Sequence, residues 1–120
     1  MKLLIVDDSL IMRRAIERTL TASRFTEIRS ASNGRLALEE FEKFKPDVVT
    51  MDITMPEMDG LTCVDAILAK NPNAMILVVS ALADKASAVE AIKRGAQGFL
   101  LKPVTAESLQ KAIDELLEDN

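Results

Sequence analysis

Five short apolar segments recur along the chain, separated by longer stretches in which apolar residues return at helical spacing. The segments have the length of strands and are expected at 3–6, 27–31, 48–51, 75–79 and 99–101. Most are aliphatic throughout, which is typical of strands buried on both faces of a sheet. The segment at 27–31 is more polar, so we expect it at a sheet edge.

The stretches between these segments predict five helices, at about 9–21, 33–44, 61–69, 85–94 and 106–117. The apolar face of the first consists of Leu10, Ile11, Ala15, Ile16 and Leu20. Gly95 is expected to end the fourth helix, and Thr105 to cap the start of the fifth. Strict alternation of strands and helices predicts an α/β fold, an open parallel sheet covered by helices on both faces.

A chain of 120 residues with 48% hydrophobic content fits one compact domain. No linker rich in Pro, Gly or Ser interrupts it, so we expect a single domain over 1–120 without an output domain. The apolar stretches are too short for a signal-peptide core or a membrane span. Cys63 is the only cysteine, which excludes a disulfide within the chain. A cytoplasmic protein without membrane contact is expected.

Composition excludes several classes of function. The net charge of -4 and the scarcity of aromatic residues (four Phe, no Tyr, no Trp) argue against a nucleic-acid partner. The absence of histidine excludes a histidine base, a histidine nucleophile and a metal held by histidine.

Polar residues follow four of the strands at their carboxyl ends. Asp7 and Asp8 follow the first strand, Asp52 the third, Ser80 the fourth and Lys102 the fifth. In open α/β sheets ligands bind outside these ends, so the side chains are expected to converge. Two carboxylates about 4 Å apart repel by about 4 kcal/mol at an effective dielectric near 20, so a cation is expected among the acids.

These residue types suit metal-assisted phosphoryl chemistry. Carboxylates and water suit Mg²⁺, which completes its shell with phosphate oxygens, while Lys102 and Ser80 suit a dianionic group beside it. We therefore expect Asp52 to act as a nucleophile that forms an aspartyl-phosphate. Taken singly, each residue has a commoner structural role; Asp8 or Ser9, for example, could only cap a helix. Their coincidence at four strand ends favours the site.

The motifs that carry these residues are LIVDDS at 4–9, MDITMPEMDG at 51–60, VSA at 79–81 and KP at 102–103. With them the chain resembles the receiver domains of two-component response regulators, and among these the stand-alone CheY-like chemotaxis proteins. The resemblance covers essentially the whole chain. It implies a single doubly wound (βα)₅ domain of the flavodoxin-like class, with five parallel strands in the order 2-1-3-4-5.

The resemblance also implies roles for the acids. Asp52 would accept a phosphoryl group from a phosphohistidine on a sensor histidine kinase. Asp7, Asp8 and Asp52 would hold Mg²⁺, together with the backbone carbonyl of Thr54.

Around the phosphoryl group, the resemblance implies a hydrogen bond from Ser80 and an ion pair with Lys102. The Lys102–Pro103 peptide is expected to be cis. Phe99 matches the family's aromatic switch, whose ring turns inward when Ser80 moves toward the phosphate. The surface that changes would be formed by the fourth helix, fifth strand and fifth helix.

Three positions depart from the best-known chemotaxis pattern. Phe99 lacks the hydroxyl of the commoner Tyr, and Val104 stands where Phe is frequent after Lys-Pro. Leu82 is apolar where an acid often lies, and with Thr54 it is expected to tune the lifetime of the phosphate. None of these positions bears on phosphorylation itself.

The expected function is a phosphorylation-activated switch in chemotaxis. The protein is expected to be a monomer whose partner is an output protein, such as a flagellar switch protein, or a phosphatase. It would catalyse only its own phosphotransfer and autodephosphorylation. Alternatives are a phosphorelay or phosphate sink in a non-chemotactic pathway, and a degenerate receiver that only mediates contacts. A small Mg²⁺-dependent phosphatase of the haloacid-dehalogenase type is a remote alternative, since Ile53 and Thr54 follow Asp52 where an Asp-x-Asp motif is needed.

Overall fold

The computed structural model describes residues 1–21, 24–53, 55 and 58–118. One sheet is formed by β1 (Lys2–Val6), β2 (Glu27–Ala31), β3 (Val48–Asp52), β4 (Met75–Ser80) and β5 (Gly98–Leu101). Its order is β2-β1-β3-β4-β5, and every neighbouring pair is parallel. The predicted flavodoxin-like topology is confirmed.

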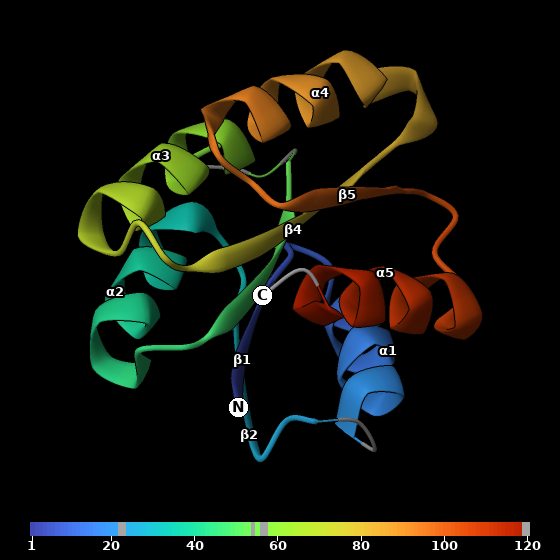
Figure 1. Cartoon of the computed structure of the whole chain (residues 1–120), viewed down its shortest axis with the longest axis horizontal. Coiled ribbons are helices and arrows are strands. Elements are labelled where there is room, and N and C mark those ends of the chain that lie inside the picture. The colour runs from blue at the N-terminus through green and yellow to red at the C-terminus, as the bar shows by residue number, and fades with distance from the viewer. Residues whose placement is uncertain (22–23, 54, 56–57, 119–120) are drawn as a thin grey trace.

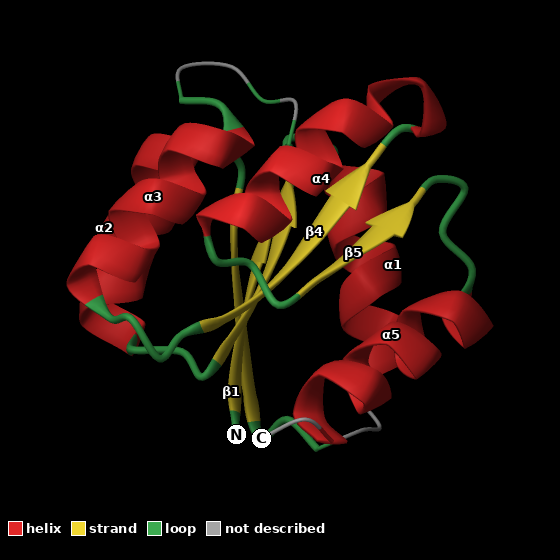
Figure 2. Ribbon diagram, turned by 45° about the horizontal axis from the view of Figure 1, so that its top comes forward, coloured by secondary structure: helices red, strands yellow, loops and turns green. Residues whose placement is uncertain are grey.

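Five α-helices join the strands: α1 (Leu10–Thr21), α2 (Gly34–Phe44), α3 (Gly60–Lys70), α4 (Lys85–Arg94) and α5 (Ala106–Glu118). α1 and α5 cover one face of the sheet, and α2, α3 and α4 cover the other (Figures 1 and 2). Their ends agree with the predicted ranges within one or two residues. No helix in the described part of the chain is long and apolar enough to cross a membrane.

A short 3₁₀ helix, η1 (Leu82–Asp84), precedes α4 and was not predicted. Three residues are too few to show a hydrophobic period, so no pattern in the sequence marks it.

The hydrophobic core lies in two layers because strand side chains alternate between the faces. Leu4, Val49 and Val78 pack toward α2, α3 and α4, whereas Leu3, Val48 and Leu77 pack toward α1 and α5. β1, β3 and β4 are therefore buried almost throughout, which explains their continuous aliphatic sequence. β2 is largely exposed and lies at the predicted edge.

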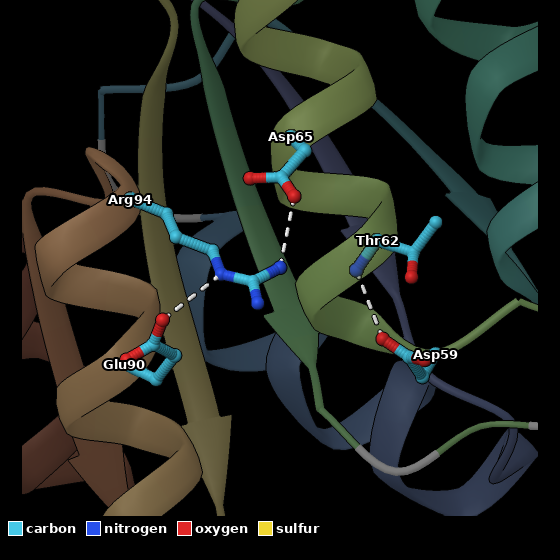
Figure 3. Close-up of polar contacts among 5 residues, drawn as sticks. All are labelled: Asp59, Thr62, Asp65, Glu90 and Arg94. Carbon is cyan, nitrogen blue, oxygen red and sulfur yellow. Dashed lines mark hydrogen bonds and ion pairs between the residues drawn. The ribbon is translucent and has the colours of Figure 1, made fainter.

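Local polar contacts define where several helices begin and end. Asp59 Oδ1 accepts a hydrogen bond from Thr62 N–H at 2.9 Å and caps α3 (Figure 3). Thr105 Oγ1 accepts from Ser108 N–H at 3.0 Å, which confirms Thr105 as the cap of α5. Gly95 ends α4 with a φ of 121°, a conformation that other residues rarely adopt, as predicted for this helix stop.

Candidate functional site

The three predicted acids converge at the carboxyl edge of the sheet. β1 and β3 are neighbours, with Val6 opposite Met51, so the residues that end them lie side by side. One carboxylate oxygen each of Asp7, Asp8 and Asp52 lies within 4.8 Å of the others. Asp7 and Asp52 are only 1% and 4% exposed, whereas Asp8 is open to solvent. A buried pair of carboxylates with an exposed third forms a negative site that a cation can enter from outside.

Asp7 has two carboxylate oxygens in different environments. Its Oδ1 accepts a hydrogen bond from Ser9 N–H at 2.9 Å, but its Oδ2 is buried and has no hydrogen-bond partner among the described residues. Burial raises the pKa of Asp7, and the negative charge of Asp8 raises it further. The Ser9 N–H and the positive charges of Lys102 and Arg13 lower the pKa, but burial is the largest effect and the pKa stays above its ordinary value. An unpaired buried carboxylate oxygen is costly, so the donor set fits a metal ion.

Ser9, and not Asp8, caps the helix that follows. Ser9 Oγ accepts a hydrogen bond from Met12 N–H at 3.2 Å in the first turn of α1. The purely structural role considered for Asp8 is thus filled by its neighbour.

Lys102 reaches the same site from the end of β5. Its Nζ lies 3.7 Å from Asp52 Oδ1, and its side chain is about one-third exposed. The Lys102 N–H donates to the Ser80 carbonyl at 2.8 Å, which ties the end of β5 to the end of β4. The Lys102–Pro103 peptide is cis, as predicted. One cation therefore already stands beside the buried carboxylate of Asp52.

Ser80 ends β4 and is 2% exposed. Its hydroxyl donates to the carbonyls of Ala81, at 3.2 Å, and Asp84, at 3.1 Å. Ser80 thus lies at the predicted strand end, with its hydrogen directed to the turn that contains η1.

Gly60 supports the site in a way that the sequence motif did not reveal. Its N–H donates to the Ile53 carbonyl at 2.7 Å, so the first residue of α3 lies against the end of β3. A Cβ added at Gly60 would stand 2.5 Å from the Asp52 carbonyl oxygen and 2.6 Å from the Ile53 Cα. Only glycine allows this approach. Thr54, the predicted carbonyl ligand, lies outside the described residues.

Phe99, the predicted switch residue, lies on β5 opposite Val78 and is 37% exposed. A surface cavity of about 440 Å³ lies elsewhere, at the ends of α2 and α3 away from the acids, and is lined by Phe41, Glu42, Lys45, Lys70 and Asn71. A phosphoryl group and one metal ion need no deep cavity, so we place the chemistry at the acids.

Comparison with known proteins agrees with this geometry. The family model for the response regulator receiver domain matches residues 3–114. The chain belongs to the response regulator receiver domain family. Two relatives named chemotaxis protein CheY, from Listeria monocytogenes and Thermotoga maritima, are 43% and 41% identical over 115 residues. These alignments cover 96% of this receiver domain and 97% and 96% of the relatives.

A solved structure, the CheX–CheY–BeF₃–Mg²⁺ complex from Borrelia burgdorferi, matches with a TM-score of 0.90 and 30% sequence identity. The match covers 97% of this chain and 88% of that one. The receiver domain is thus CheY-like over nearly its whole length. The comparisons support the predicted function, a phosphorylation-activated signalling switch in chemotaxis, and do not favour the alternatives.

Proposed function

We propose that Asp52 accepts a phosphoryl group from a phosphohistidine of a sensor histidine kinase. An Asp52 carboxylate oxygen attacks phosphorus, the P–N bond breaks, and its electron pair leaves with the imidazole nitrogen, which takes up a proton. The observation that carries this proposal is the position of Asp52, nearly buried between two further acids and the ammonium group of Lys102. A carboxylate needs no general base for this attack, which suits a chain without histidine.

Asp7, Asp8 and Asp52 would hold Mg²⁺, with the Thr54 carbonyl as the expected further ligand. The Oδ2 of Asp7, to which no described residue donates a hydrogen bond, supports this donor set. When bound, Mg²⁺ supplies the positive charge that offsets repulsion between the acids and the entering phosphoryl oxygens.

Lys102 and Ser80 act on the transferred group. The Lys102 ammonium group attracts the phosphoryl oxygens and holds their charge beside Asp52. The Ser80 hydroxyl donates to a phosphoryl oxygen once it is free of the carbonyls to which it is now bound.

The proposed output surface is formed by α4, β5 and α5. Val89 and Ile92 on α4 and Phe99 on β5 are each more than one-third exposed, so this surface offers three apolar side chains to a partner. Phosphorylation would change this surface through Ser80 and Phe99 and so control a partner such as a flagellar switch protein, while a phosphatase resets the switch. The CheX–CheY–BeF₃–Mg²⁺ complex, in which a similar CheY binds a second protein, supports a protein partner for this chain. We propose a monomer that catalyses only its own phosphotransfer and dephosphorylation.

The test is labelling by a small phosphodonor such as acetyl phosphate, with and without Mg²⁺, read by intact mass. The native protein is expected to gain one phosphoryl group with Mg²⁺, and Asp52→Asn none. Asp114→Asn is the control, because Asp114 lies half-exposed on α5. Equal labelling of Asp52→Asn would refute the assignment of the acceptor, and an unlabelled native protein would favour a receiver that only binds.

A further inference from the structure

The hydroxyl of Ser80 is engaged by the turn that leads to α4. A serine hydroxyl has one hydrogen, and here it is shared between the carbonyls of Ala81 and Asp84. A hydrogen bond from Ser80 to a phosphoryl oxygen therefore requires that this hydrogen leaves both carbonyls. The turn and the phosphoryl group compete for one donor.

The turn is closed on its other side by Ser87. Ser87 Oγ donates to Asp84 Oδ1 at 2.7 Å, in the first turn of α4. Asp84 thus accepts from two serines, through its carbonyl from Ser80 and through its carboxylate from Ser87. It is the residue that connects the end of β4 to the start of α4.

This use of the Asp84 side chain differs from that of the other cap residues. Asn33 and Asp59 accept hydrogen bonds from backbone N–H groups of their own helices. Asp84 occupies the same position before α4, yet its side chain makes no such bond to the described backbone. Its carboxylate accepts the hydrogen bond from Ser87 instead, and this bond fixes Asp84 within the turn.

We propose that Asp84 and Ser87 are positioning residues for the phosphorylation reaction. They hold the turn in the conformation in which the Ser80 hydrogen is withheld from the phosphoryl site, so they set how readily Ser80 is released. The inference rests on the proposed function, because it assigns a role through the contact between Ser80 and the phosphoryl group.

The energetics allow such a release. The Ala81 carbonyl still accepts from the Asp84 N–H at 2.9 Å after Ser80 departs, so that carbonyl keeps a partner. A hydrogen bond to an ionised phosphoryl oxygen is stronger than one to a neutral carbonyl. The resting conformer is thus the one in which Ser80 bonds the carbonyls of the turn. A turn held less firmly raises the fraction of molecules in which Ser80 is ready to bind the phosphoryl group.

The experiment measures the affinity for beryllofluoride with Mg²⁺ by ¹⁹F NMR. In its adduct with Asp52, fluorine atoms stand where phosphoryl oxygens would lie. Ser87→Ala is expected to bind about three- to tenfold more tightly than the native protein, the range set by the loss of one hydrogen bond. Ser87→Thr keeps a hydroxyl and is expected to restore native affinity.

Ser108→Ala is the matched control. Ser108 is also the third residue of its helix and also bonds the side chain of the cap residue, with its Oγ 3.0 Å from Thr105 Oγ1. Its removal is expected to lower the thermal unfolding temperature as Ser87→Ala does, without changing the affinity for beryllofluoride. A merely structural role of Ser87 would make the two variants alike in both measurements.

A double-mutant cycle shows whether Ser87 acts through Ser80. In the Ser80→Ala background, Ser87→Ala is expected to leave the affinity unchanged. A gain that persists there, or a native-like affinity of Ser87→Ala alone, would overturn the inference while the proposed function stands. If the native protein fails to bind beryllofluoride, both are overturned.

Discussion

The ammonium group of Lys102 lies 3.7 Å from Oδ1 of Asp52, although β4 separates the strands at whose ends the two residues lie. The side chain of Lys102 therefore crosses the carboxyl edge of the sheet to reach a nearly buried carboxylate. Because Asp52 also stands beside Asp7 and Asp8, the position of this one cation matters for the whole site.

Lys102→Met is expected to slow labelling by a small phosphodonor, by about tenfold or more, because a positive charge that attracts the phosphoryl oxygens is lost. The rate is measured by intact mass at saturating Mg²⁺. Lys111→Met is the control, since Lys111 is exposed on α5. A labelling rate of Lys102→Met equal to that of the native protein would contradict the role of Lys102.

Asp7 predicts a pH dependence of stability in magnesium-free buffer. Burial raises its pKa above the ordinary value of 3.8, so the folded protein holds this proton more tightly than the unfolded chain. The contribution of Asp7 is therefore fully present below pH 3.8 and is lost as the pH rises through the raised pKa. Urea unfolding with a chelator is expected to show that the native protein loses stability relative to Asp7→Asn over this range. A difference that is constant with pH would contradict the raised pKa.

Bound Mg²⁺ is expected to make the native protein more stable than Asp7→Asn at neutral pH. An ion that binds only the folded state stabilises it by roughly 1.4 kcal/mol at ten times its Kd. The native protein is expected to gain this stability, and Asp7→Asn, which lacks one of the three carboxylates, much less. Thermal unfolding across a Mg²⁺ titration measures both, and equal gains would remove Asp7 from the ligand set.

Much of this architecture could be predicted from the sequence because the signals are local and strong. β1, β3 and β4 are buried on both faces, so their aliphatic runs identify them, and parallel pairing then brings Asp7 and Asp52 to one edge. The start of α5 followed from one residue type, Thr105.

The unpredicted features depend on direction and distance, which residue types do not encode. The bond from Ser80 to the Asp84 carbonyl depends on how a three-residue turn orients one peptide group. That no described residue donates to the Oδ2 of Asp7 depends on the exact distances to its neighbours. The role of Gly60 depends on a contact of α3 with the end of β3, although the motif contained this glycine.

Gly60→Ala is expected to destabilise the protein by about 1–3 kcal/mol, because the added methyl group would overlap the backbone at Asp52 and Ile53. It should also slow labelling, since any shift of this backbone moves the acceptor. Gly98→Ala is the matched control: its Cβ would lie 3.4 Å from Leu77 Cδ1, an ordinary contact. Urea unfolding of the two variants tests the difference, and equal stability would refute the close approach at Gly60.

Phe99 offers a test of the proposed switch by NMR. Its ring is partly exposed on β5 in this structure, and we expect it to become more buried when beryllofluoride and Mg²⁺ bind. Phe44 is the internal control, because its ring is buried next to Arg29, whose guanidinium carbon lies 4.7 Å from the ring centroid. Ring proton shifts and contacts of Phe99 should therefore change while those of Phe44 stay constant. If both rings keep their environment although the ligand is bound at Asp52, the signal leaves the site by another route than Phe99.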